Sequence, residues 1–326
     1  MYSTHQAPDA TWVDARVREA LDLRKLTLDA DTTAYRLLFG EGDGLPGVTA
    51  DRYGDHIVIL SYAPGLEQVV EWACASLLQQ LAPRSIVHKP AGSSEGATQV
   101  LHGKKPPNEI VVTENGLRFR VELGKAQKSG LFLDHRDNRA FVARLARNAR
   151  VLNLFSYTGA FSVYAAAAGA RQVTTVDVAP GVVDAARENF KLNGLDPNAH
   201  HFEVADVFAW VDAARERNGN FDLVICDPPS LARRKEQRVQ ALKAYRKLNT
   251  AVMRLVTPGG LLATASCTAQ VDVSAFQRTV AEAATRARRR FQILRDAAHA
   301  ADHPVMAHHP EGRYLKFLLG RVIQLP

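Results

Sequence analysis

The chain has 326 residues, of which 46% are hydrophobic and 23% are charged, so its composition excludes a fibrous or disordered protein and its length fits one large or two modest domains. Lys and Arg outnumber Asp and Glu by 41 to 34, and the resulting net charge of +7 is compatible with a nucleic-acid partner without requiring one. The three cysteines have no CxxC spacing, which argues against a disulfide framework and a structural zinc site.

The N-terminal part of the chain predicts a helix followed by short strands and turns. Apolar residues recur at three-to-four spacing over 12–28 and predict an amphipathic helix. Further on we expect short strands, a helix over 66–81 and a polar loop over 93–107. Asn115-Gly116 lies between two β-type runs and is the strongest hairpin signal in the chain. This mixture of short elements indicates a small α+β fold.

Beyond about residue 140, strands alternate with helices. Such repetition predicts a mostly parallel sheet that is covered by helices on both faces. The last two β-type runs, FQILRDA and YLKFLLGRV, have no helix between them and predict an antiparallel hairpin at the end of the sheet. We therefore expect an N-terminal helical segment, 1–33, a small α+β domain, 34–125, and a Rossmann-like α/β domain with a seven-stranded sheet, 126–326.

Small or acidic residues follow three successive strands of this sheet: Gly159, Asp177 and Asp206. A glycine lets the backbone approach a ligand at the carboxyl edge of an open α/β sheet, and a neighbouring acid can accept hydrogen bonds from ribose hydroxyls. The alternative is that the two acids only cap the helices that follow them. We favour a nucleoside ligand, because acids at successive strand ends flank the glycine turn.

Two further groups are expected at the same edge of the sheet. The fourth strand ends in Asp227-Pro228-Pro229, where the prolines either fix the carboxylate or serve only as a loop signal. The fifth strand ends at Cys267, and a lone cysteine in such a position is usually an inert small hydrophobe. Cys226 is a competing thiol, but strand alternation directs it to the face opposite that of Asp227, so we expect it in the core.

Several stretches of the chain together resemble a known family. The chain looks like a class I S-adenosylmethionine-dependent methyltransferase, and specifically like the bacterial enzymes that methylate carbon-5 of cytosine in large-subunit ribosomal RNA. The cysteine of SCT and the ADHP tail favour this family over the related guanine-N7 methyltransferases, which share NLFSYTG and GLFLDHR. From about Tyr35 to the C-terminus, the matching stretches are GEGDGLPGVTADRYGD (40–55), KSGLFLDHRDNR (128–139), VLNLFSYTGAF (151–161), FDLVICDPPS (221–230), TASCT (264–268) and AADHPVMAHHPEGRYLKF (300–317).

The resemblance implies S-adenosylmethionine as the cofactor and assigns roles to individual residues. It implies that Asp177 binds the ribose, that Asp206 lies on the adenine side, that Asp227 binds the target base and that Cys267 is the catalytic thiol. The residues implied to bind the cofactor are Phe155, Ser156, Tyr157, Thr158, Gly159, Asp177, Asp206, Asp227, Asp134 and Arg136.

The chemistry of cytosine explains why such an enzyme needs a thiol and an acid. Carbon-5 is a poor nucleophile, and a thiolate that adds to carbon-6 raises its electron density. Our mechanistic hypothesis is that Cys267 makes this addition while Asp227, held by Pro228 and Pro229, hydrogen-bonds the N3 and amino edge of the base. Carbon-5 then accepts the methyl group, a base removes its proton, and the thiolate leaves. The target base must be unpaired or flipped out of a helix.

Basic residues after the Asp-Pro-Pro turn are the expected RNA contacts. Arg233, Arg234 and Lys235 would bring positive charge to the entrance of the site, where they would bind phosphates. For Lys243 and Arg246, further along, a solvated helix face is the simpler explanation.

The remaining features limit the partners of the protein. His299 and His303 are four residues apart, but no Cys or carboxylate completes a ligand set at the usual spacing, so we expect no metal. We expect no membrane partner either, because no segment approaches the roughly 18 consecutive apolar residues of a membrane span. Free thiols and the absence of a signal-peptide pattern favour the cytoplasm. The sequence leaves a homodimer open.

Two departures from the family pattern leave alternatives open. Family members often begin with a PUA RNA-binding domain, for which this chain starts too late, and Ser230-Leu231 differs from the usual residues after the two prolines. An enzyme that methylates another RNA atom, such as guanine N7, is the first alternative, and a non-catalytic RNA-binding factor with the same fold is the second. A nicotinamide-dependent oxidoreductase is disfavoured by the missing GxGxxG and by the Asp-Pro-Pro turn.

Overall fold

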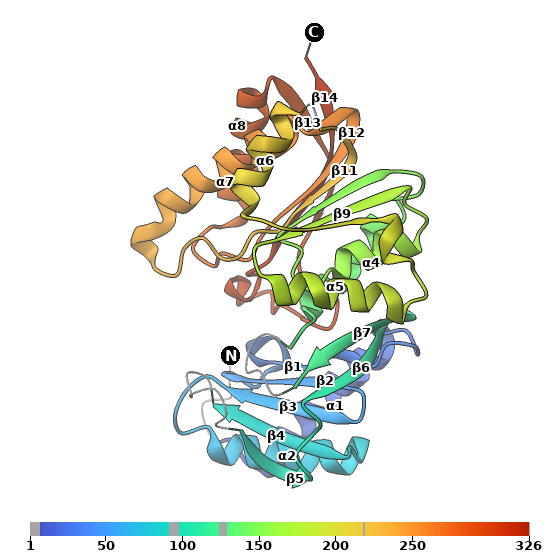
Figure 1. The fold of residues 1–326 in the computed structure, drawn as a ribbon. Coiled ribbons are helices and arrows are strands. Elements are labelled where there is room, and N and C mark those ends of the chain that lie inside the picture. The colour runs from blue at the N-terminus through green and yellow to red at the C-terminus, as the bar shows by residue number, and fades with distance from the viewer. Residues whose placement is uncertain (1–6, 91–97, 124–128, 218, 326) are drawn as a thin grey trace. The chain divides into compact units, whose positions relative to one another are not determined.

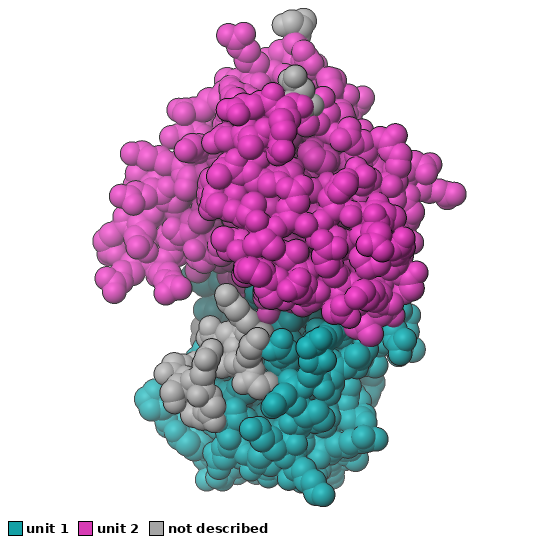
Figure 2. Space-filling view, viewed as in Figure 1, with its two compact units in different colours: residues 1–134, 300–312 teal, residues 135–299, 313–326 magenta. Residues whose placement is uncertain are grey.

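The computed structural model describes residues 7–90, 98–123, 129–217 and 219–325. The chain forms two compact units: unit 1 consists of 1–134 and 300–312, and unit 2 of 135–299 and 313–326 (Figure 2). The predicted boundary between residues 125 and 126 lies outside the described residues. We expected 300–312 in the C-terminal domain, whereas the structure assigns this segment to unit 1.

Unit 1 contains a five-stranded sheet with the order β1-β2-β3-β4-β5. Only β3 and β4 are parallel, since helix α2 crosses over between them. Val17 of α1 and Leu77 of α2 are both buried in one core with Ile59 of β3. The elements are α1 (Ala10–Thr27), β1 (Ala34–Phe39), β2 (Val48–Tyr53), β3 (His56–Ser61), α2 (Glu67–Leu81), β4 (Ser85–Pro90) and β5 (Gln99–Gly103).

The predicted hairpin is confirmed as β6 (Glu109–Glu114) and β7 (Leu117–Glu122). Asn115 and Gly116 have φ of 48° and 77°, the left-handed backbone that a two-residue type I′ turn needs. The prediction of a loop over 93–107 is wrong at Gln99–Gly103, which form β5 and pair antiparallel with β4. This edge strand is largely exposed, so its sequence lacks the apolar alternation that marks a buried strand.

Segment 300–312 belongs to unit 1 because buried polar groups hold it there. The guanidinium of Arg24 binds both carboxylate oxygens of Asp43, at 2.6 and 2.7 Å, and also donates to the carbonyl oxygen of Asp302 at 2.6 Å. The N–H of Arg36 donates to Asp302 Oδ2 at 2.9 Å. These partners lie far apart in the chain, so local sequence patterns could not predict the docking.

Unit 2 is built on a seven-stranded sheet with the order β10-β9-β8-β11-β12-β14-β13. The first five strands in this order are parallel, and β14 is antiparallel to both of its neighbours, as the terminal hairpin predicted. The strands are β8 (Arg150–Leu154), β9 (Gln172–Asp177), β10 (His201–Val204), β11 (Phe221–Cys226), β12 (Val256–Ser266), β13 (Arg289–Ala297) and β14 (Lys316–Gln324).

Helices cover both faces of this sheet (Figure 1). Trp210 of α6, Tyr245 of α7 and Phe276 of α8 share one buried core with the strands, while α3 and α5 both pack against α4 on the other side. The helices are α3 (Arg136–Ala143), α4 (Ala160–Ala167), α5 (Pro180–Leu192), α6 (Val207–Glu216), α7 (Arg238–Met253) and α8 (Val273–Ala287). The predicted Rossmann-like α/β fold with a mostly parallel seven-stranded sheet is therefore confirmed.

The strand order determines where a ligand can bind. The order reverses at β8, which has β9 on one side and β11 on the other. In open α/β sheets, ligands bind outside the carboxyl ends of the strands at such a switch point. The ends of β8 and β11 are in register, since Leu154 pairs with Cys226, so the residues that follow them meet at one edge.

Candidate active site

The loop 155–159 makes a strained turn between β8 and α4. Phe155, Tyr157 and Gly159 have φ of 55°, 50° and 75°. A left-handed backbone costs roughly 1–3 kcal/mol at a residue other than glycine, so the surrounding structure must stabilise it at the two aromatic residues. At Gly159 a Cβ atom would lie 2.7 Å from the Cβ of Ala186 in α5, closer than real contacts allow. The loop therefore packs against α5 with no room for a side chain at this position.

Asp177 holds this loop through its carboxylate. Asp177 Oδ2 accepts a hydrogen bond from the N–H of Tyr157 at 2.9 Å, and Oδ1 accepts one from the N–H of Ala179 at 3.2 Å. The sequence did not predict this anchoring role. A carboxylate offers about four acceptor positions, so two bonds to the backbone leave capacity for two ribose hydroxyls.

Asp206 is the N-cap of α6. Its Oδ1 accepts the N–H of Ala209 at 2.9 Å, so the capping role that we considered as the alternative is realised at this acid. The residue is exposed, and no described residue hydrogen-bonds its Oδ2. Asp206 can therefore cap the helix and still accept one further hydrogen bond.

Asp227 is paired with a histidine that the sequence analysis did not select. His135 Nε2 lies 3.2 Å from Asp227 Oδ2, and the histidine side chain is 5% exposed against 24% for the carboxylate. Asn138 Nδ2 lies 3.0 Å from the carbonyl oxygen of Ala298 and 3.3 Å from His135 Nδ1. Since the amide donates to the carbonyl, its second N–H faces Nδ1, which favours the histidine tautomer with its proton on Nε2. That proton is donated to Asp227 and orients the carboxylate.

Thr268 joins the ends of β11 and β12 through its hydroxyl. Thr268 Oγ1 accepts the N–H of Leu231 at 3.0 Å and lies 2.7 Å from the hydroxyl of Tyr245 in α7. The pKa of Tyr245 is raised to about 12, mainly by burial and also by negative charge on Cys267 and Asp227, while hydrogen bonds with Ser266 and Thr268 act in the opposite direction. The tyrosine hydroxyl therefore stays protonated at neutral pH as part of this connection.

The thiols differ in the way that strand alternation predicted. Cys226 is fully buried, and burial together with the charge of Asp227 raises the pKa of its thiol, so it is held as a neutral core residue. Cys267 follows the last residue of β12 and is partly exposed. Of these two thiols, Cys267 is the one that a substrate can reach.

Lys316 is a second residue that the sequence analysis missed. It is 2% exposed at the start of β14 and pairs across the sheet with Ser266, directly before Cys267. Its ammonium donates to the carbonyl oxygens of Thr268 and Tyr314 at 2.7 and 2.8 Å. A charged residue inside the apolar run YLKFLLG was the available sequence signal.

The other predicted residues are distributed as follows. Ser156 and Thr158 are buried within the loop, and the carbonyl oxygen of Thr158 accepts a hydrogen bond from Asn189 Nδ2 at 2.9 Å. Asp134 lies in a short 3-10 turn, Leu133–His135, where its carbonyl oxygen accepts the N–H of Ala300 at 2.8 Å. Arg136 starts α3 and is buried, with Nε 3.2 Å from Asp137 Oδ1.

The turn after β11 is followed by exposed positive charge. Pro228 is buried and Pro229 exposed, and Arg233, Arg234 and Lys235 are all exposed. Two basic residues beyond them are engaged within the fold instead: Arg238 pairs with Asp272 at 2.8 Å, and Arg246 with Glu282 at 2.6 Å.

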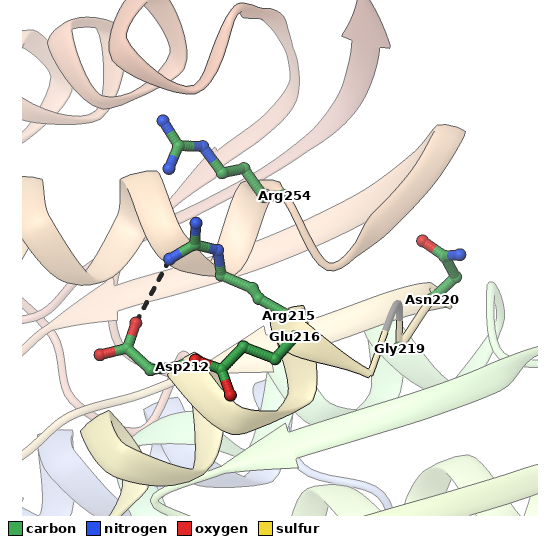
Figure 3. Close-up of a pocket in the computed structure, with 6 residues that line it drawn as sticks. All are labelled: Asp212, Arg215, Glu216, Gly219, Asn220 and Arg254. Atoms are coloured by element: carbon green, nitrogen blue, oxygen red, sulfur yellow. Dashed lines mark hydrogen bonds and ion pairs between the residues drawn. The ribbon is translucent and has the colours of Figure 1, made fainter.

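A polar hollow elsewhere on unit 2 is not part of this site (Figure 3). Asn220 precedes β11 and Arg254 precedes β12, so the hollow lies at the amino ends of strands whose carboxyl ends carry Asp227 and Cys267. Within the described ranges, no group of three or more His, Cys, Asp or Glu side chains could hold a metal ion. Among the same residues, no helix is long and apolar enough to cross a membrane.

Comparison with known proteins agrees with the geometry at this edge. Residues 64–293 match the family model of S-adenosylmethionine-dependent methyltransferases. The chain is 39% identical to ribosomal RNA large subunit methyltransferase I of Tolumonas auensis over 97% of this chain and 81% of the relative. It is 38% identical to the protein of the same name from Shewanella denitrificans, over 98% of this chain and 83% of that protein.

A solved structure is similar over nearly the whole chain. It is a crystal structure described as a methyltransferase complexed with SAH, with a TM-score of 0.88 and 30% sequence identity, and the match covers 98% of this chain and 83% of the other. The similarity therefore includes both units.

Proposed function

The chain belongs to the family of S-adenosylmethionine-dependent methyltransferases, and from this premise we propose that it methylates carbon-5 of a cytosine in large-subunit ribosomal RNA. The relatives named ribosomal RNA large subunit methyltransferase I support the RNA substrate. The chemistry at the ends of β11 and β12 supports cytosine as the target base.

The residues after β8, β9 and β10 fit a nucleoside cofactor. Asp177 keeps acceptor capacity for ribose hydroxyls after its two backbone bonds, and Asp206 keeps Oδ2 for the adenine side. Gly159 has no Cβ, which lets the loop 155–159 pack against Ala186 of α5 and fixes its backbone at the end of β8. S-adenosylmethionine, when bound, supplies a methyl group activated by its sulfonium. Asp134 and Arg136 are secondary candidates for closing the site.

The observation that carries the proposal is the pairing of a reachable thiol with an oriented carboxylate. β11 and β12 are parallel neighbours in which Cys226 pairs with Thr264, and Asp227 and Cys267 follow their ends. In the proposed reaction the Cys267 thiolate adds to carbon-6 of the base. Asp227, oriented by His135 and held by Pro228 and Pro229, hydrogen-bonds the N3 and amino edge.

The rest of the catalytic cycle restores the thiolate. After carbon-5 has accepted the methyl group, a base removes the proton from this carbon. The electron pair of the C–H bond then re-forms the ring double bond as the thiolate leaves carbon-6. Cys267 is therefore unchanged at the end, and the cytosine has exchanged a proton for a methyl group.

RNA binding is assigned to two regions. Arg233, Arg234 and Lys235 are exposed after the Asp-Pro-Pro turn and suit phosphate contacts. We assign the second region to unit 1, which contains the predicted small α+β domain and N-terminal helix, and unit 2 is then the methyltransferase domain. The proposed location of the enzyme is the cytoplasm, where ribosomal RNA is modified. A homodimer is tested separately, by light scattering of the purified protein.

Nucleoside mass spectrometry tests the proposal. Large-subunit RNA from cells that lack the protein is incubated with the enzyme and S-adenosylmethionine, and the digest is searched for 5-methylcytidine and 7-methylguanosine. We expect 5-methylcytidine with the wild type and with Cys226→Ala, and none with Cys267→Ala. Appearance of 7-methylguanosine would support the guanine-N7 alternative. Absence of any methylated nucleoside, together with no cofactor binding by calorimetry, would support a non-catalytic factor.

A further inference from the structure

Lys316 is a buried cation at the start of a largely apolar strand. The side chain is 2% exposed and starts a strand whose next residues, Phe317, Leu318 and Leu319, are buried and apolar. A buried charge is costly unless it is paired, so a lysine in this position needs an electrostatic reason. The two carbonyl oxygens of Thr268 and Tyr314 satisfy two of the three N–H bonds of its ammonium.

The third N–H bond has no acceptor among the residues that the structure describes. Both carbonyl partners are neutral, so they leave the positive charge without a counter-ion. One of them belongs to Thr268, the residue directly after Cys267. The ammonium is thus fixed beside the turn that carries the proposed nucleophile.

The ionisable groups around Lys316 show where its charge acts. The pKa of Lys316 is lowered to about 8, mainly by burial and also by the charge of Arg313, while negative charge on Cys267 and Asp272 acts in the opposite direction. The Coulomb interaction is mutual, so a thiolate that stabilises the ammonium is itself stabilised by it. Negative charge on Asp227 and on Cys267 each raises the pKa of Tyr245, so both groups act on the same hydroxyl. A nearby cation would favour the charged form of the thiol at this edge.

We propose that Lys316 is a positioning residue that favours the thiolate of Cys267 over its thiol. This inference rests on the proposed role of Cys267 as the nucleophile. At neutral pH, below its pKa of about 8, Lys316 keeps its proton during the reaction, and it contacts neither the base nor the cofactor. The proton of the thiol passes to solvent and its electron pair stays on sulfur, from which it forms the bond to carbon-6 of the base. When that bond breaks after methylation, the electron pair returns to sulfur beside the ammonium.

The rate of alkylation of Cys267 by iodoacetamide as a function of pH tests the inference without any RNA. Peptide mass spectrometry separates Cys267 from Cys74 and Cys226, which are buried. Replacing the lysine by an uncharged side chain of similar length, Lys316→Met, should move the midpoint of the profile up by about one pH unit or more, the effect of removing a nearby opposite charge. Lys316→Arg keeps the charge and should keep a midpoint near that of the wild type.

A second buried lysine provides the matched control. Lys89 in β4 is 5% exposed and donates to the carbonyl oxygen of Leu123, and burial lowers its pKa, but it belongs to unit 1. Lys89→Met should leave the alkylation profile of Cys267 unchanged. An equal shift in Lys89→Met and Lys316→Met would show a general loss of stability and would contradict the inference.

If the Lys316 variants do not fold, the alkylation profile of the wild type still tests the inference. Its Cys267 should titrate below the ordinary thiol value of about 8.5. A midpoint at or above that value, or an unchanged midpoint in a folded Lys316→Met, would overturn the inference. The proposed function fails by a different result, namely methylation of cytosine by Cys267→Ala.

Discussion

The carboxyl edge of the unit 2 sheet has two parts that are held together in different ways. At the ends of β8 and β9, the loop 155–159 is fixed by backbone geometry and by Asp177, which binds the N–H of Tyr157 only 20 residues away. At the ends of β11 and β12, Asp227 and Cys267 depend on side chains that are distant in the chain, namely His135 and Lys316. The first part is encoded locally and the second is assembled by the fold.

This difference has a functional consequence. The contacts that hold the cofactor-binding part lie within a short stretch of chain, so a substitution at a distant residue leaves them intact. At the second part, each contact with a distant residue can be removed by a single substitution. Variants of the second part should therefore lower the rate of methylation without changing cofactor affinity. Variants of the first part should mainly change the affinity for the cofactor.

Among the variants that compare the two parts of the edge, the largest effect is expected when the carboxylate of Asp227 loses its orienting partner. His135→Asn should lower kcat by about 10- to 100-fold, the usual effect of removing a residue that orients a reactive group, with an unchanged dissociation constant for S-adenosylmethionine. The control is His200→Asn. His200 is partly buried and, like His135, packs against a phenylalanine, and at the far end of β9 its Nδ1 accepts the N–H of Val173. Loss of cofactor binding in His135→Asn would contradict the separation of the two parts.

The next effect concerns the cofactor-binding part. Gly159→Ala should weaken S-adenosylmethionine binding about tenfold or more, because a Cβ would collide with Ala186 and a φ of 75° is strained for alanine. Calorimetry measures this affinity. Gly181→Ala is the matched control in α5, where nothing lies within 4 Å of the added Cβ, and it should leave the affinity unchanged. A normal affinity for Gly159→Ala would argue against close packing of the loop.

Removing the hydroxyl that joins β11 and β12 should have a moderate effect. Thr268→Val leaves the N–H of Leu231 without its acceptor and should lower kcat about tenfold, or about 1.4 kcal/mol, which is near the lower end of the cost of an unsatisfied donor. Thr264→Val on the same strand is the control, since Thr264 Oγ1 is buried and makes no hydrogen bond to a described residue. Steady-state kinetics should separate the two variants. Equal rates would show that the hydroxyl of Thr268 does not support the active site.

The smallest effect is expected at the exposed basic residues. Changing Arg233, Arg234 and Lys235 together to Ala should weaken RNA binding several-fold at moderate salt and reduce the dependence of affinity on salt concentration, because up to three phosphate contacts are lost. The same change at Arg286, Arg289 and Arg290 serves as the control. Filter binding at several salt concentrations measures both, and an unchanged salt dependence in the first variant would exclude this RNA contact.

The same contrast explains which features could be predicted from the sequence. Strand and helix alternation predicted the sheet of unit 2, and the residues after its strands predicted an edge with Gly159, Asp177 and Asp227, because these signals are local. The roles of His135 and Thr268 depend on contacts between distant segments, so no spacing could reveal them. For Lys316 the sequence offered a signal, a charge inside an apolar run, but not its partners. The docking of 300–312 in unit 1 through Arg24, Asp43 and Asp302 escaped prediction for the same reason.

Covalent trapping tests the central claim most directly. RNA that carries 5-fluorocytidine at the target position blocks the last step of the proposed reaction, since fluorine cannot leave carbon-5 as a proton does. With S-adenosylmethionine present, the wild type should form a denaturation-resistant adduct, and peptide mapping should locate the bond at Cys267. Cys267→Ala should form none, and Cys226→Ala should form as much as the wild type. An adduct that persists in Cys267→Ala, or cytosine methylation without any adduct, would contradict the account.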